Sequence, residues 1–204
     1  MVRRPPRRTG RSRAMNSNLA FQESPREELI GGKLVAMSPR PFPNHNRVAE
    51  NIDFIFRLYL RGKTCVPLGD GYDLYLTEQD RFVPDFMIVC DRGKIKYNGV
   101  HGAPDLVVEV LSRGTTANDR WHKKEAYERS GVPEYWIVSA QEETIEVYLL
   151  QEGSYILDNI YTYYPAEDLA DMKPEERAAV ATAFKCHLYD DLLIHLDDIF
   201  GDLF

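Results

Sequence analysis

The chain has 204 residues, 44% of them hydrophobic, which is enough for one domain with a buried core. No run approaches the roughly 20 apolar residues of a membrane span, and the N-terminus lacks the apolar segment of a secretory signal. We therefore expect a cytoplasmic protein that does not enter a membrane. The formal net charge of −7 argues against a protein that simply coats nucleic acid through Lys and Arg.

The first 14 residues differ in charge from the rest of the chain. They carry six arginines and no acid, so the chain from Met15 onwards has a net charge of −13. An Arg-rich tail with Pro and Gly cannot bury a core of its own. We expect residues 1–20 to be a disordered extension or a misplaced start before Met15, with a transit peptide as a further alternative. Residues 21–204 are expected to form a single domain.

The first predicted elements are a strand pair and a helix. Residues 27–37 predict two short strands that turn at Gly31-Gly32. Asn44 is expected to cap a helix that runs to Arg61 and is stopped by Gly62. At 100° per residue, one apolar stripe of this helix should pack on a sheet, and it consists of Val48, Ile52, Ile55 and Tyr59.

Several strands should follow, with a second helix among them. The expected strands are 72–76, 82–90, 106–111, 134–138 and 144–150. A helix at about 117–130, ended by Gly131 and Pro133, lies between the third and fourth strands and favours parallel pairing of these two. The fold class is therefore α/β. After Tyr155 we expect a helix at 174–184 and a C-terminal segment that serves as cover and interface.

The three cysteines are interpreted as small core residues in a reducing cytoplasm. Cys65, Cys90 and Cys186 are odd in number and far apart in the sequence. They lack Cys-x-x-Cys or Cys/His ligand spacing, so neither a disulfide framework nor a zinc site is indicated.

One carboxylate interrupts a run that should be wholly apolar. Glu109 lies in Leu-Val-Val-Glu-Val-Leu, which is typical of a central strand covered on both faces, where an unpaired charge costs several kcal/mol. Asp85 lies near the start of another strand of this kind. Two carboxylates on adjacent strands are the hard oxygen ligands that Mg²⁺ or Mn²⁺ accepts. The alternatives are a Glu109 paired with an Arg and an Asp85 that only forms a turn.

The helix that follows Glu109 directs a lysine towards the sheet. Its side of low charge contains Asp119, Lys123 and Tyr127 at spacings that align side chains. A buried lysine is unusual unless a carboxylate or a phosphate meets it. The structural alternative is a Lys123–Asp119 pair that holds the helix in place.

Two strings in the sequence carry a resemblance to a known family. Residues 102–112 read GAPDLVVEVLS, and residues 131–138 read GVPEYWIV. Together with Pro84-Asp85 they resemble the PD-(D/E)XK signature of the restriction-endonuclease-like superfamily and, within it, a bacterial family of restriction endonuclease-like proteins. The resemblance extends from about Glu28 to Phe200. It implies a restriction-endonuclease-like core, with a mixed central sheet flanked by helices, an N-terminal hairpin and C-terminal additions.

The same resemblance implies an Mg²⁺-dependent endonuclease that hydrolyses phosphodiester bonds in DNA. Asp85 and Glu109, with the backbone carbonyl of Val110, would hold Mg²⁺ or Mn²⁺. Lys123 would position or deprotonate the attacking water. The residues that would orient Lys123 are Asp119 and Tyr127.

The sequence departs from the superfamily pattern at the lysine. The usual position, two residues after the second acid, holds Leu111, and the resemblance implies a lysine on the following helix, which Lys123 matches. Many superfamily members also direct a first-helix Glu at the site. Glu50 is the nearest candidate but falls opposite the apolar stripe, whereas His45 lies on the side of the stripe. Both are retained as candidate site residues.

Other functions remain open at this point. A binding or regulatory protein without turnover, on a degenerate nuclease scaffold, would suit the acidic body and the lack of a recognisable DNA-reading motif. A third possibility is a purely structural Glu–Lys pair. For a nuclease, DNA is the expected substrate, and a homodimer is expected by analogy, because duplex cleavage requires two cuts.

Overall fold

A mixed six-stranded sheet forms the centre of the molecule. The computed structural model describes residues 27–37, 42–112 and 119–204, so the Arg-rich tail lies outside it. The strand order is β12-β11-β10-β9-β6-β3. The strands are β3 (Val66–Gly69), β6 (Phe86–Val89), β9 (Leu106–Val110), β10 (Glu134–Ser139), β11 (Thr144–Gln151) and β12 (Ser154–Thr162). β9 and β10 pair in parallel, as predicted, and the other neighbours pair antiparallel.

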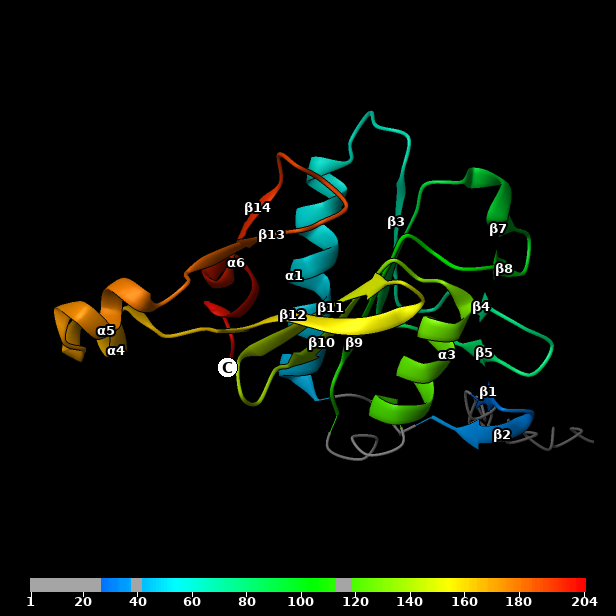
Figure 1. The fold of residues 1–204 in the computed structure, drawn as a ribbon, viewed down its shortest axis with the longest axis horizontal. Helices are drawn as coiled ribbons and strands as arrows, with labels where there is room; N and C mark the ends of the chain where they lie inside the picture. The colour runs from blue at the N-terminus through cyan, green and yellow to red at the C-terminus, as the bar shows by residue number, and fades with distance from the viewer. Residues whose placement is uncertain (1–26, 38–41, 113–118) are drawn as a thin grey trace, which may run out of the picture.

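Helix α1 (Pro43–Tyr59) covers one face of this sheet (Figure 1). The predicted apolar stripe is confirmed, because Val48 and Ile52 are fully buried against the sheet and Ile55 and Tyr59 pack beside them. The predicted cap at Asn44 is wrong. The N-cap residue is Phe42 and the helix begins at Pro43, a residue favoured in the first turn because its fixed φ is already helical.

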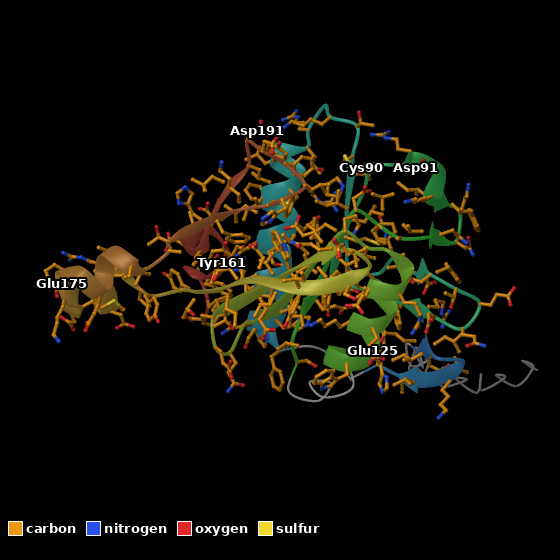
Figure 2. All side chains as sticks on the ribbon, in the orientation of Figure 1. Cys90, Asp91, Glu125, Tyr161, Glu175 and Asp191 are labelled. Atoms are coloured by element: carbon orange, nitrogen blue, oxygen red, sulfur yellow. A yellow bond between two sulfur atoms is a disulfide. The ribbon has the colours of Figure 1, made fainter. Side chains whose placement is uncertain are left out.

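The other face of the sheet is covered by α3 (Lys124–Ser130), which continues a π-helical turn at Asp119–Lys123. Ala126 and Tyr127 pack into this second core, whereas Glu125, labelled in Figure 2, is exposed. The helix ends at Gly131, as predicted, with a φ of 83° at this residue. Glycine adopts this left-handed conformation without a steric penalty.

A second six-stranded sheet lies beside the first, in the order β2-β1-β5-β4-β8-β7. Its strands are β1 (Glu27–Ile30), β2 (Lys33–Ala36), β4 (Leu74–Tyr75), β5 (Arg81–Phe82), β7 (Ile95–Lys96) and β8 (Gly99–His101), with a short 3-10 helix at Arg92–Lys94. The predicted N-terminal strand pair is confirmed. The predicted strand 82–90 is instead divided into β5 and β6, with Pro84 between them, because proline has no N–H for a strand ladder.

The C-terminal segment contains more strand than the sequence pattern suggests. The long strand β12 was not predicted, and the helix expected at 174–184 stops after α5 (Pro174–Ala179). The chain continues as β13 (Ala183–Lys185), which pairs with β14 (Leu193–His195). Helix α6 (Leu196–Phe200) then packs on the α1 side of the core, so the expected role as cover is confirmed. Helices α4 (Ala166–Asp171) and α5 project from the body, and Glu175 is labelled there (Figures 1 and 2).

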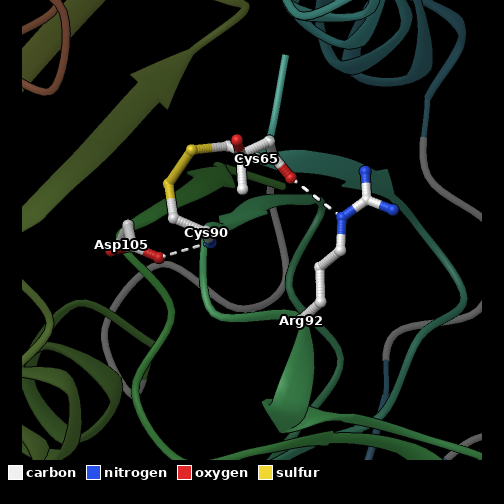
Figure 3. The surroundings of a disulfide bond; sticks show 5 residues. Cys65, Cys90, Arg92 and Asp105 are labelled. Atoms are coloured by element: carbon white, nitrogen blue, oxygen red, sulfur yellow. Dashed lines mark hydrogen bonds between the residues drawn. A yellow bond between two sulfur atoms is a disulfide. The ribbon is translucent and has the colours of Figure 1, made fainter. Parts of the chain in front are cut away.

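Two of the three cysteines form a disulfide, so the interpretation of all three as free core thiols is wrong. Cys65 and Cys90 are bonded, and Cys186 is free and buried. The antiparallel register of β3 and β6 pairs Val66 with Val89. The residues that flank this pair, Cys65 and Cys90, therefore lie opposite each other despite 25 residues of separation (Figure 3). The N–H of Cys90 also donates to Asp105 Oδ2 at 2.7 Å.

Candidate active site

Glu109 is buried on the α3 side of the central sheet. It alternates along β9 with Val108 and Val110, which face the α1 core. Its side chain is 9% exposed. Glu109 Oε1 accepts a hydrogen bond of 2.6 Å from the Tyr127 hydroxyl, and Lys123 Nζ lies 3.2 Å from both carboxylate oxygens. The charge that interrupts the apolar run is therefore compensated from the neighbouring helix.

Asp85 lies beside Glu109, immediately before β6. The register of β6 and β9 pairs Phe86 with Val108, so the next position along brings Asp85 opposite Glu109. Asp85 Oδ2 accepts a hydrogen bond of 2.7 Å from the backbone N–H of Val110. The strand pairing thus brings the two acids together on the same side of the sheet, as residues opposite each other in a ladder share a face.

Lys123 is held between two carboxylates in the last position of the π-helical turn. The residue is 4% exposed, and its Nζ lies 3.0 Å from Glu28 Oε1 in addition to its contacts with Glu109. The helical pattern places Lys123 on the sheet side, and the structure shows it there. The hydroxyl of Tyr127 donates to Glu109, so Tyr127 reaches the lysine through their shared carboxylate.

Glu28 belongs to this cluster and was missed in the sequence. It lies on β1, is 5% exposed, and its Oε1 also accepts a hydrogen bond of 2.8 Å from the backbone N–H of Val83. The neighbouring Glu27 is exposed. Because side chains alternate along a strand, one of Glu27 and Glu28 must face inward. The sequence does not predict which one, since the choice depends on the pairing of β1 with β5.

The remaining predicted site residues have different positions. His45, at the start of α1, is 8% exposed, and its Nε2 lies 3.5 Å from Asp85 Oδ1. Glu50 is exposed on the outer side of α1 and takes no part in the cluster. The side chain of Asp119 lies outside the described residues.

Burial makes the acidic groups of the cluster hard to ionise. Burial raises the pKa of Glu109 to about 8, with Lys123 opposing the shift and the charge of Asp85 adding to it. The pKa of Asp85 is also raised by burial, against the opposing effects of His45 and the Val110 N–H. The pKa of Tyr127 lies well above its ordinary value, first through burial and then through Glu109.

The donor set suits a hard divalent cation. Magnesium in proteins is commonly bound by one or two carboxylates, with water completing its shell. Asp85 and Glu109 supply two carboxylates with free lone-pair capacity, because an ionised carboxylate has about four acceptor sites. Burial is the largest cause of the raised pKa of both groups, and a bound cation would favour their ionised forms. Within the described ranges, no group of three His, Cys, Asp or Glu side chains forms a metal cluster, so such a site would rest on two side chains and main-chain oxygen.

The described part of the chain contains no helix that is both long and apolar enough to span a bilayer.

Comparison with known proteins identifies relatives along most of the chain. The model of the Uma2 family, described as "Putative restriction endonuclease", matches residues 14–177. An uncharacterised protein of Synechocystis sp. is 28% identical over 160 residues, which are 76% of this chain and 82% of that protein. The crystal structure of a "putative nuclease" from Anabaena variabilis is similar in fold, with a TM-score of 0.64 and 18% identity, over 87% of this chain and 90% of that one.

Proposed function

The chain belongs to the Uma2 family, whose model carries the description "Putative restriction endonuclease", and we propose that it hydrolyses phosphodiester bonds in DNA with a divalent cation. The observation that carries this proposal is the cluster itself. Two carboxylates, Asp85 and Glu109, lie on one face of adjacent strands, and a buried lysine contacts one of them. Buried titratable side chains whose pKa values are strongly shifted are typical of functional sites.

Each residue has a role that follows from its position. Asp85 and Glu109, with the backbone carbonyl of Val110, would hold Mg²⁺ or Mn²⁺. A bound divalent cation supplies a Lewis acid that polarises the scissile phosphate and lowers the pKa of a coordinated water. The Lys123 ammonium would orient the attacking water and neutralise charge that develops on the phosphate. His45 Nε2 lies 3.5 Å from Asp85 Oδ1 and would help the Val110 N–H to orient this carboxylate.

A plasmid-nicking assay with Mg²⁺ or Mn²⁺ tests the proposal. The variants Asp85→Asn, Glu109→Gln and Lys123→Met should each lower the nicking rate by roughly 100-fold or more. Glu50→Gln is the matched control, because it removes one carboxylate charge from the exposed side of α1 and should cleave like wild type. Wild-type rates in all three site variants would refute the assignment.

A non-catalytic, regulatory protein is the second candidate. It is favoured by the net charge of −13 from Met15 onwards and by the engagement of Glu109 with both Lys123 and Tyr127. Calorimetric titration with Mn²⁺ near neutral pH separates the two functions. Binding that is lost in Asp85→Asn supports the nuclease, and the absence of binding in wild type supports the regulatory protein.

For a nuclease of this kind we further propose a homodimer, because cleavage of a duplex requires a cut in each strand. Light scattering after size exclusion should then give twice the mass of the chain.

A cytoplasmic location also stays a prediction. The Cys65–Cys90 disulfide weighs against it because cytosolic thiols are kept reduced.

A further inference from the structure

The cluster holds a third buried acid that neither the proposed metal ligands nor the proposed chemistry uses. Glu28 has a side chain only 6% exposed, and it comes from a different sheet than Asp85 and Glu109. Burying a second carboxylate near Glu109 is costly, and the charge of Glu28 itself contributes to the raised pKa of Glu109. A carboxylate that is this unfavourable to bury is expected to have a role other than packing.

Glu28 is fixed in place by the backbone on both sides. β1 pairs with β2, which places Glu28 opposite Val35, and it contacts β5 through Leu29 and Arg81. The N–H of Val83 donates to Glu28 Oε1 at 2.8 Å. Val83 precedes Pro84-Asp85 directly, so the same short segment holds Glu28 and carries one of the proposed metal ligands. The position of Glu28 is therefore set relative to Asp85 by the main chain.

Lys123 contacts two carboxylates, one from each sheet. Its Nζ lies 3.0 Å from Glu28 Oε1 and 3.2 Å from Glu109 Oε1. If Glu109 directs its oxygens to a divalent cation, Lys123 loses part of that pairing and is repelled by the added positive charge. Glu28, which is anchored by the Val83 N–H, then remains as a carboxylate in contact with the ammonium.

We propose that Glu28 is a positioning residue that holds the Lys123 ammonium in place when Glu109 takes up a divalent cation. The role rests on the proposed nuclease function. It requires a charge on Glu28, and it requires that Glu28 does not itself bind the metal. Both requirements can be examined with small changes of the side chain.

The test compares Glu28→Gln and Glu28→Asp with wild type, in Mg²⁺-dependent nicking and in Mn²⁺ calorimetry. Gln retains the shape and the acceptor for the Val83 N–H but has no charge. Its kcat should fall by roughly 10- to 100-fold, the loss expected for a misplaced catalytic group, with KM and the Mn²⁺ Kd close to wild type. Asp retains the charge and should recover part of kcat. The matched control is Glu27→Gln, because Glu27 is the adjacent acid on β1 and is exposed.

A second measurement does not depend on cleavage. An amine-reactive reagent, followed by mass spectrometry, reports how accessible Lys123 is, with the exposed Lys33 as an internal reference. Lys123 should be protected in wild type with or without Mg²⁺. In Glu28→Gln it should be protected in EDTA, where Glu109 still holds it, and become several-fold more reactive when Mg²⁺ is added.

Three results would overturn the role of Glu28. The first is a kcat of Glu28→Gln equal to that of wild type. The second is a loss of Mn²⁺ affinity in Glu28→Gln as large as the loss in Glu109→Gln, which would make Glu28 a metal ligand. The third is a Lys123 reactivity in Glu28→Gln that does not change when Mg²⁺ is added. Failure of the proposed function looks different, because wild type itself would then cut no DNA. If wild type still binds Mn²⁺, the Lys123 reactivity decides the role of Glu28, and if it binds none, the role falls together with the metal site.

Discussion

The charged side chains of the site are buried, and close neighbours compensate their charges. Glu109 could be predicted from the sequence because one acid stands out in an apolar strand, and Lys123 because helical spacing places it on the sheet side. Glu28 could not be predicted in the same way. Its partner Lys123 is 95 positions away, and only the pairing of β1 with β5 brings the two together.

The raised pKa of Glu109 gives the metal-free protein a definite pH dependence. Its pKa is about 8 in the folded chain, against an ordinary value of 4.5. The folded state thus keeps a proton that the unfolded chain releases, so the contribution of this group to stability falls as the pH rises through that window. The side chain of Glu109→Gln cannot ionise, so this variant lacks the pH-dependent contribution to stability. Thermal unfolding in EDTA at several pH values should show wild type losing stability relative to Glu109→Gln as the pH rises, and a constant difference would contradict the pKa.

Elements with a regular pattern were predictable, and contacts between distant strands were not. The stripe of α1 and the apolar run of β9 follow from periodicity, which is a local property. The Cys65–Cys90 bond depends on the pairing of β3 with β6, which are separated in the chain by β4 and β5. Such a pairing is not encoded in any one segment. β12 forms a hairpin with the adjacent β11, but most of its residues are exposed, so it lacks a regular apolar alternation.

The disulfide between β3 and β6 predicts the number of free thiols. Titration of the unfolded, unreduced protein with a thiol reagent should give one thiol, from Cys186. After reduction it should give three, one from each cysteine. A value of three before reduction would show that the chain folds with its cysteines reduced.

The C-terminal helix α6 should contribute strongly to stability, because it closes the core over α1. Phe200 is 2% exposed and belongs to the core cluster that includes Val48 and Ile52. Phe200→Ala should lower the free energy of unfolding by about 3–5 kcal/mol, as measured by urea denaturation. Phe204→Ala is the control, because Phe204 is 86% exposed and its change should stay within about 0.5 kcal/mol. Equal effects would mean that α6 is not packed as described.

For the molecule as a whole, the negative charge bears on how DNA could approach. The chain from Met15 has a net charge of −13, and in the site Glu28 and Glu109 both contact Lys123 while Asp85 lies opposite Glu109. DNA phosphates are repelled by such a surface unless cations screen or bridge it. Fluorescence anisotropy with a short duplex should therefore show tighter binding in Ca²⁺ than in EDTA. The double variant Asp85→Asn/Glu109→Gln should lose this difference, and equal binding in wild type would argue against a metal-bridged contact.

A crystal grown with Mn²⁺ and measured at an anomalous wavelength would show directly whether the two acids bind a metal. We predict a peak between the carboxylates of Asp85 and Glu109, with the Lys123 ammonium beside it and held by Glu28. A peak elsewhere, or no peak while Glu109 stays paired with Lys123 and Tyr127, would contradict the proposed metal site.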